Sequence, residues 1–191
     1  MPPEPLKAAY HSLLEIPKLL EEFKPDIVIH IALAVNRNFL SIERGATRDG
    51  YHQYPDVARK VFNKAEIRKT WGKSPKDLNS SLDLDDILVK WQTQAGKGSD
   101  LKMSDDVGTY VFSFVYYTSI ECVWKNGGGE MPVVFMHVPS LPEKDGVEKG
   151  TKVTIALVKG YGREHRQVKY CIYAATHISS RFSSVLQRIP K

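Results

Sequence analysis

The stretch that decides the fold is residues 108–141, GTYVFSFVYYTSIECVWKNGGGEMPVVFMHVPSL. It predicts a helix over roughly 108–124, a glycine turn at 126–129 and a buried strand over 132–138. The helix is rich in aromatic and β-branched residues of modest helix propensity, so burial must stabilise it. The strand ends in His137-Val138-Pro139. A histidine at the end of a buried strand, close to a helix N-terminus, is a common arrangement for a nucleophile site in an α/β protein.

The chain before this stretch predicts helices alternating with buried strands. Residues 6–23 carry apolar side chains at helical spacing, and Pro25 ends that pattern. The run IVIHIALA at 27–34 is nearly all apolar, which is typical of a strand covered on both faces. Together these elements favour a parallel sheet with helices packed against it.

The remaining segments predict shorter elements. We expect a loop over 36–56 that contains one short strand at 39–43, followed by a surface excursion over 57–80. A helix over 82–94, a strand at 101–104 and a second surface helix over 146–160 complete the prediction. Ser104, Asp105 or Asp106 is expected to cap the helix that begins near residue 108.

Composition and charge narrow the function classes. The 191 residues suffice for one domain, with 42% hydrophobic and 26% charged residues. The formal net charge is +5, but the basic residues are scattered and no aromatic side chains are interleaved with them along one face. A solvated surface is therefore favoured over a nucleic-acid-binding one, and no nucleic-acid partner is predicted.

The cysteines and the apolar runs narrow the function classes further. Cys122 and Cys171 are the only cysteines and form no C-x-x-C pair, so neither a metal site nor a disulfide framework is indicated. No signal-peptide pattern is visible, and the longest apolar run, 27–35, is too short to span a bilayer. We expect a cytosolic protein without a membrane segment, and nothing indicates a cofactor.

Two groups of polar residues have both a functional and a structural interpretation. Asp83, Asp85 and Asp86 could bind a divalent cation, but the positive end of a helix explains them better. His30 lies inside a predicted buried strand, where a hydrogen-bonded core histidine is the favoured interpretation over a ligand.

Four stretches together resemble pyroglutamyl peptidase I, the cysteine peptidase that removes N-terminal pyroglutamate (5-oxoproline) from peptides. IVIHIALA leads through a loop into SIERGA at 41–46, which is similar to the family's strand and glutamate-arginine loop. NSSLDLDDIL at 79–88 resembles the helix before the family's nucleophile. SDDVGTYVFSFVYYTS at 104–119 is similar to the nucleophile segment, and VFMHVPSL at 134–141 to the strand of the catalytic histidine. The matches follow the family's order and cover about residues 10–160.

The resemblance implies a three-layer α/β/α sandwich around a mixed, largely parallel sheet. It also implies a Cys-His-Glu mechanism, in which the glutamate falls on Glu43 and the histidine on His137. The family reads Gly-x-Tyr-x-Cys where this chain has Gly108, Tyr110 and Phe112, so phenylalanine occupies the nucleophile position. Phenylalanine has no nucleophilic atom. Alternatives remain for the other two residues: Glu43 could pair with a neighbouring arginine, Arg44 or Arg48, and His137 could be purely structural.

Three other residues of the chain carry a hydroxyl or thiol that could substitute for the missing nucleophile: Ser113, Cys122 and Cys171. Ser113 follows Phe112 directly, but one step along a helix turns a side chain by about 100°. Cys122 lies ten residues further on, roughly 15 Å along the same helix. Cys171 lies outside the resemblance. We therefore expect none of them to replace the nucleophile.

A second departure concerns the beginning of the chain. By the resemblance, a first strand and a Gly/Phe-rich loop that contributes to the pyroglutamyl pocket precede the helix with which this sequence starts. We expect one domain over 1–169 that lacks this strand, and an irregular C-terminal tail over 170–191. A missing strand would leave apolar surface and backbone groups uncovered, which a second copy or a partner could cover.

Three functions follow as hypotheses. The first is a pyroglutamyl-peptidase-like protein that is impaired or inactive in hydrolysis and binds peptides with N-terminal pyroglutamate. The second is an active cysteine-type peptidase that releases pyroglutamate. The third is a non-catalytic interaction module. The sequence leaves open whether the chain is an enzyme.

Overall fold

The computed structural model describes residues 6–127, 132–140, 146–161 and 170–174. The elements follow one another in this order: α1 (Tyr10–Leu13), α2 (Ile16–Phe23), β1 (Ile27–Ala34), β2 (Leu40–Glu43), β3 (Gly45–Thr47), α3 (Lys64–Trp71), β4 (Asp77–Asn79), α4 (Leu84–Ala95), β5 (Leu101–Ser104), α5 (Val111–Lys125), β6 (Val133–Pro139), α6 (Gly146–Tyr161) and β7 (Tyr170–Ala174).

The central sheet is mixed and largely parallel, as predicted. Its strand order is β5-β2-β6-β1-β7, while β3 and β4 form a separate antiparallel pair. β1 runs parallel to both β6 and β7, and β2 runs parallel to β5. The antiparallel contact is between β2 and β6. The predicted fold class is therefore confirmed.

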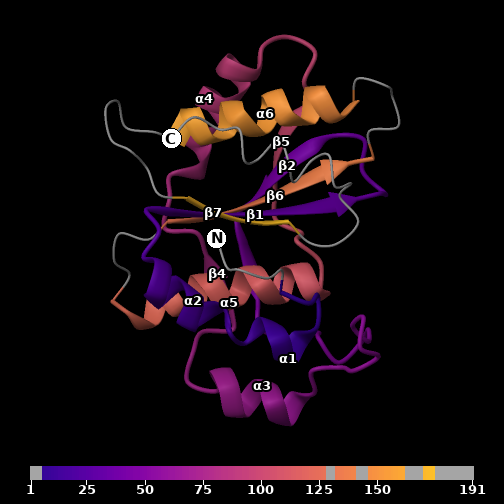
Figure 1. Ribbon diagram of the computed structural model, residues 1–191, viewed down its shortest axis with the longest axis vertical. Coiled ribbons are helices and arrows are strands. Elements are labelled where there is room, and N and C mark those ends of the chain that lie inside the picture. Colours follow the sequence, from indigo (N-terminus) through magenta and orange to yellow (C-terminus); the bar gives the residue numbers. More distant parts are fainter. Residues whose placement is uncertain (1–5, 128–131, 141–145, 162–169, 175–191) are drawn as a thin grey trace.

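Helices cover both faces of the sheet, which gives three layers (Figure 1). α4 and α6 lie on one face, and α1, α2, α3 and α5 lie on the other. Side chains of β1 alternate between the two cores: Val28 and Ala32 pack towards α5, whereas Ile29 and Ile31 pack towards α4 and α6. This alternation explains why the strand is apolar at almost every position.

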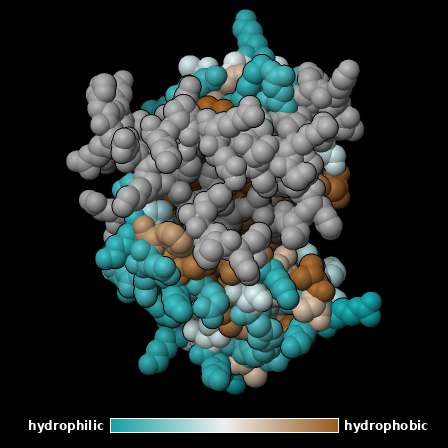
Figure 2. Space-filling view, viewed as in Figure 1, coloured by the Kyte–Doolittle hydropathy of each residue, from teal (hydrophilic) through white to brown (hydrophobic). Residues whose placement is uncertain are grey.

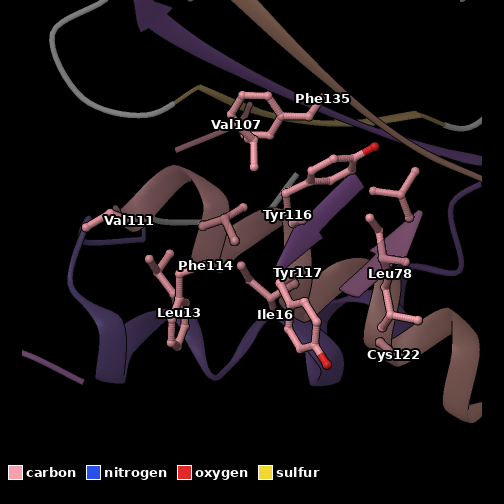
Figure 3. Close-up of a cluster of buried hydrophobic side chains, with 14 of the residues drawn as sticks. Leu13, Ile16, Leu78, Val107, Val111, Phe114, Tyr116, Tyr117, Cys122 and Phe135 are labelled. Carbon is pink, nitrogen blue, oxygen red and sulfur yellow. The ribbon is translucent and has the colours of Figure 1, made fainter. Parts of the chain in front are cut away.

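The face covered by α5 is aromatic. Phe114 is completely buried, and its ring lies 5.0 Å from those of both Trp71 and Phe62. Tyr116 lies 5.3 Å from Phe135 of β6, centroid to centroid, and the two rings are drawn close together in Figure 3. Burial of these rings compensates for the modest helix propensity of α5, as the sequence predicts.

The opposite face is mainly aliphatic. Ile29, Ile42 and Met136 of the sheet pack against apolar residues of α4 and α6. Trp91 of α4 is fully buried, and its indole nitrogen donates a 2.8 Å hydrogen bond to the carbonyl of Val153 in α6. This bond joins the two outer helices and satisfies the one polar atom of a buried indole.

The helix expected over residues 6–23 is divided into two. α1 ends at Leu13, and α2 begins at Ile16 with Pro17 in its first turn. Proline has no backbone N–H to donate to the carbonyl four residues earlier, so the hydrogen-bond ladder is interrupted and a new helix begins.

The surface excursion expected over 57–80 contains two regular elements, α3 and β4. α3 begins with a capping box: the side chain of Asn63 accepts from the amide of Glu66, and the Glu66 carboxylate accepts from the amide of Asn63. This N-x-x-E pattern is visible in the sequence but follows a polar segment with little apolar periodicity.

The helix expected at 108 begins at Val111 instead. Its N-cap residue is Tyr110, which makes no side-chain capping bond, so the predicted caps at Ser104, Asp105 and Asp106 are wrong. Asp106 closes a local turn by accepting a 3.0 Å hydrogen bond from the amide of Gly108. Gly108 has φ +78°, a left-handed conformation that ends any helical path before α5.

The prediction of an irregular tail is wrong for residues 170–174. They form β7, which pairs with β1 from Ile27 to Ile31 and places Cys171 opposite Val28 in the ladder. β1 therefore has a neighbouring strand on each side, and the expected uncovered backbone is not found along this part of it. Residues 162–169 and 175–191 lie outside the described residues.

On the side of the molecule seen in Figure 2, the described surface around α1, α2 and α3 is mostly hydrophilic, with small separate apolar areas. None of the described helices is long and apolar enough to cross a bilayer.

Candidate active site

Glu43 and His137 come from adjoining antiparallel strands and share one face of the sheet. In the β2–β6 ladder, Ser41 is opposite His137 and Glu43 is opposite Phe135. Side chains two residues apart on a strand point to the same face, so all four lie on the side where Phe135 packs in the aromatic core with α5. Glu43 therefore reaches His137 diagonally across the strand pair.

The Glu43 carboxylate is completely buried and accepts three hydrogen bonds at one oxygen. The donors to Oε1 are His137 Nδ1 at 2.7 Å, Arg37 Nη1 at 2.6 Å and Ser41 Oγ at 2.9 Å. A buried carboxylate is tolerated only when paired in this way. We call these four residues, Arg37, Ser41, Glu43 and His137, the carboxylate cluster.

Arg37 lies in the turn just after β1. Its Nη1 also donates to Ser41 Oγ at 2.6 Å, and its Nη2 donates to the carbonyl of Asp106 at 2.5 Å. The guanidinium thus connects three segments: the end of β1, the strand β2 and the loop that precedes α5. Its planar set of donors suits such a bridging position better than the single ammonium of a lysine would.

The cluster fixes the protonation pattern of the imidazole. Arg37 Nη1 also lies 3.4 Å from His137 Nδ1, but a guanidinium can only donate, and Glu43 is the closer partner. Nδ1–H therefore donates to the carboxylate. Nε2 is left as the basic nitrogen, which is the arrangement that an acid–base histidine requires.

The charge state of Glu43 follows from its contacts. Burial by itself raises the pKa of a carboxyl group, but the polar surroundings outweigh it here: His137 foremost, together with Ser104 and Arg37, holds the pKa of Glu43 below its usual range. Glu43 is thus an anion at neutral pH, able to orient the imidazole and to stabilise its protonated form.

The alternative partners expected for Glu43 are engaged elsewhere. Arg44 pairs with Asp85 at 2.9 Å and with Asp105 at 3.4 Å. Arg48 donates to the carbonyls of Trp71 and Ser74. The interpretation of Glu43 as a loop carboxylate paired with either arginine is therefore wrong, and the residue lies in a strand.

The three aspartates at the start of α4 have structural contacts. Asp83 caps the helix by accepting from the amide of Asp86 at 3.0 Å, Asp85 pairs with Arg44, and Asp86 pairs with Lys90. Among the described residues there is no group of three or more side chains arranged to hold a metal ion.

Phe112 is the second residue of α5 and is half-buried. It packs at the margin of the aromatic core, with its ring 6.0 Å from that of Tyr110 and nearly perpendicular to it. A side chain at this position lies in the first turn, where the helix dipole would stabilise a negative charge. Phenylalanine makes no use of that property.

The other candidate nucleophiles have different surroundings. Ser113 is completely buried, and its hydroxyl lies 3.4 Å from the hydroxyl of Tyr51. Cys122 is buried near the other end of α5, where burial raises the pKa of its thiol. A thiol with a raised pKa forms little of the reactive thiolate. The side chain of Cys171 lies outside the described part of the structure.

His30 has the structural environment that the sequence favours. Its Nε2 lies 2.9 Å from the hydroxyl of Ser119, and burial lowers its pKa to about 3, so the ring is neutral. Tyr116 is also a packing residue, but its hydroxyl donates to the backbone carbonyl of Glu43 at 2.8 Å. α5 is thereby hydrogen-bonded to the strand that carries the carboxylate.

The sequence did not identify three residues near the buried carboxylate: Arg37, Ser41 and Ser104. A signal existed for Arg37: it is the first charged residue after a buried strand, and loops at the carboxyl ends of parallel strands form the ligand sites of open α/β sheets. The two serines carry no such signal, because serine is common at strand ends and in loops.

Comparisons with known proteins agree with this fold. Residues 6–176 match the pyroglutamyl peptidase family. The chain is 34% identical to pyrrolidone-carboxylate peptidase of Pyrococcus furiosus over 158 residues, which cover 83% of this chain and 72% of that protein. It is 25% identical to human pyroglutamyl-peptidase 1 over 126 residues, which cover 66% of this chain and 55% of the human protein.

Solved structures of pyroglutamyl peptidases are also similar to this chain. A mutant pyrrolidone carboxyl peptidase from P. furiosus superposes with a TM-score of 0.65 at 25% identity, covering 81% of this chain and 78% of that one. Pyroglutamyl peptidase I from Bacillus amyloliquefaciens, at 18% identity and a TM-score of 0.64, shares the fold. The chain belongs to the pyroglutamyl peptidase family.

Proposed function

We propose that this chain is a pyroglutamyl-peptidase-like protein that keeps the acid–base half of the family's site and lacks its nucleophile. Glu43 and His137 occupy the family's glutamate and histidine positions, and Phe112 occupies the cysteine position. In this proposal the protein binds peptides with N-terminal pyroglutamate and hydrolyses them poorly or not at all.

The observation that carries the proposal is the carboxylate cluster. An exposed remnant of a site would need no such organisation, yet here a buried carboxylate holds His137 at 2.7 Å and is itself held by Arg37 and Ser41. The cluster lies on the sheet face covered by α5, the helix whose first turn carries Phe112. These contacts support a retained histidine–carboxylate pair.

The loss of hydrolysis follows from the chemistry of the first turn of α5. A cysteine there would be stabilised as a thiolate by the helix N-terminus and by a protonated histidine, and would attack the carbonyl carbon of the substrate. Without it, His137 can still hydrogen-bond a ligand, but no covalent intermediate can form at this position.

An active peptidase remains the competing function. The chain spans 72% of the length of the Pyrococcus enzyme and 55% of the human one, so activity of those whole proteins does not transfer automatically. Activity in this chain would require another nucleophile. Ser113 is buried, and the raised pKa of the Cys122 thiol disfavours a thiolate, so neither residue is suited to be that nucleophile.

The direct test is hydrolysis of a fluorogenic pyroglutamyl amide by the natural protein and by Phe112→Cys. We expect no turnover by the natural protein. Phe112→Cys should raise the rate by roughly 100-fold or more over background, the scale of a positioned acid–base group. An iodoacetamide-treated sample and the double variant Phe112→Cys/His137→Ala should both return to background.

Two results would contradict the proposal. Turnover by the natural protein that thiol reagents abolish would show an active cysteine that we have not placed. Calorimetry with a pyroglutamyl dipeptide, compared with the same dipeptide carrying N-terminal proline, tests the retained binding. If the two dipeptides give the same heat of binding, or neither gives any, the protein does not recognise pyroglutamate. That result would favour a non-catalytic interaction module.

A further inference from the structure

A second concave site lies away from the carboxylate cluster. It is a cavity of about 710 Å³ between the segment after β3, the helix α3 and the residues just before α5. Its size falls within the usual range for small-molecule sites. Neither Glu43 nor His137 lines it, so the cluster does not explain it.

The lining of this cavity is strongly cationic. The described residues of the lining carry a formal charge of +3, because Asp49 contributes one negative charge and four side chains contribute positive charges: Arg48, Lys64, Arg68 and Lys76. We call these four cationic side chains the basic ring. They come from three separate segments of the chain, so neither a single charge run nor the sequence pattern reveals them.

Among the described residues, three of the four side chains of the basic ring have no carboxylate partner within ion-pair distance. In the part of the chain that the structure describes, the side chains of Lys64, Arg68 and Lys76 take part in none of the ion pairs. Other surface cations, such as Arg44 and Lys90, do have carboxylate partners. Unpaired like charges around one cavity repel one another, and a bound anion removes that repulsion.

Arg48 is held rigidly at the base of the ring. Its Nη1 donates to two backbone carbonyls, those of Trp71 at 2.7 Å and Ser74 at 2.5 Å. Its Nε is buried and has no hydrogen-bond partner among the described residues. Because this atom is enclosed by the protein, Arg48 contributes its positive charge to the cavity, and not a hydrogen bond from Nε.

The opposite wall is also fixed in position. Gly50 has φ +101°, and a Cβ there would lie 2.8 Å from the methyl group of Thr109, so only glycine fits this close approach. Thr109 lines the cavity and lies three residues before Phe112. The cavity is therefore part of the folded framework and extends to the start of α5.

We propose that this cavity binds a small polyanion carrying two or more phosphate or carboxylate groups. One such group interacts with the basic ring near Arg48, and a second reaches Lys64, Arg68 or Lys76. Among the described residues of the lining, His52 is the only aromatic ring, and these residues offer no stacking surface of Trp, Tyr or Phe for a nucleobase. This inference does not rest on the proposed function, because it involves neither Glu43, His137 nor Phe112.

The experiment is calorimetric titration of the full chain with inorganic tripolyphosphate and, separately, with citrate, at low and at physiological salt. We expect saturable binding at one site, weakening steeply as salt rises. The double variant Arg68→Ala/Lys76→Ala should raise the Kd at least tenfold. Stronger binding of tripolyphosphate than of citrate identifies phosphate as the preferred group, and the reverse identifies carboxylate.

The matched control is Lys69→Ala/Lys73→Ala. It removes the same charge from neighbouring exposed positions that do not line the cavity, so its Kd should stay within twofold of the natural protein. Circular dichroism checks that both variants are folded. An equal loss of affinity in the two double variants would overturn the proposal, because binding would then reflect net charge alone. Absence of binding by both anions at low salt would overturn it as well.

Discussion

The sheet and the helix that meet at the family's active site differ sharply in this protein. The sheet side contributes a buried network of polar contacts, in which Arg37 and His137 both donate to Oε1 of Glu43. The first turn of α5 contributes Phe112, an apolar ring at the edge of the core. The difference teaches that a buried polar network does not depend on a reactive atom beside it, because its hydrogen bonds pair the buried charges of Arg37 and Glu43 whether or not catalysis occurs.

Among the residues of the candidate site, the largest loss of stability is expected on the sheet side. Glu43→Ala removes the common acceptor and leaves Arg37 without its charge partner, which should cost about 3 kcal/mol of unfolding free energy. Urea denaturation monitored by circular dichroism measures this. In the double variant Arg37→Ala/Glu43→Ala no charge is left unpaired, so its loss should be smaller than the sum of the two single losses. If the loss in the double variant equals the sum of the two single losses, Arg37 and Glu43 do not stabilise each other.

Acid should lower the unfolding free energy mainly through a buried histidine of the sheet, His30 in β1. The pKa of His30 is lowered to about 3 in the folded protein, so between pH 6.5 and 3 the unfolded chain binds a proton that the folded chain does not. The unfolding free energy should therefore fall as pH falls below 6.5, by up to about 1.4 kcal/mol per pH unit. The pKa of Glu43 is also lowered, and its contribution is lost only below the ordinary carboxyl value of 4.5.

His30→Asn tests this assignment. The variant should show a flatter dependence of unfolding free energy on pH between 6.5 and 4.5, measured by urea denaturation at a series of pH values. The matched control is His52→Asn, because His52 is exposed. If the two variants flatten the profile equally, burial of His30 is not the source of the acid sensitivity.

The smallest stability effect is expected at the start of α5. Phe112 is half-buried, so Phe112→Ala should cost about 1 kcal/mol. Phe114 lies two residues further along and is completely buried. Phe114→Ala should therefore lower the unfolding free energy by about 3–5 kcal/mol. Thermal and urea unfolding of the two variants give the comparison. A loss at Phe112 as large as that at Phe114 would mean that the phenylalanine has become part of the core.

Much of the framework could be predicted from local patterns. The run at 27–34 was identified because parallel strands buried on both faces are continuously apolar, and the aromatic helix because its length and period leave little alternative. The division between α1 and α2, the element α3 and the strand β7 were missed. In these regions proline, a capping box in a polar segment or pairing with a distant strand outweighs the apolar pattern.

The site was predictable only in part. Glu43 and His137 were found through resemblance to a family motif, and Phe112 was found through the same alignment. Arg37 was not, because nothing in the sequence states that the turn after β1 lies beside both β2 and the loop before α5. The basic ring was invisible for the same reason, since its members lie in the sequence among unrelated surface lysines and arginines.

By itself the sequence determined the layered α/β architecture, the family, and the absence of a sulfur atom at position 112. These follow from periodicity, from motif order and from residue identity, which are properties of short segments. Only the tertiary structure decided that Glu43 accepts from His137, Arg37 and Ser41, and that four scattered cations line one cavity. The reason is that strand pairing and helix packing bring together side chains up to 100 residues apart, and no local pattern encodes those contacts.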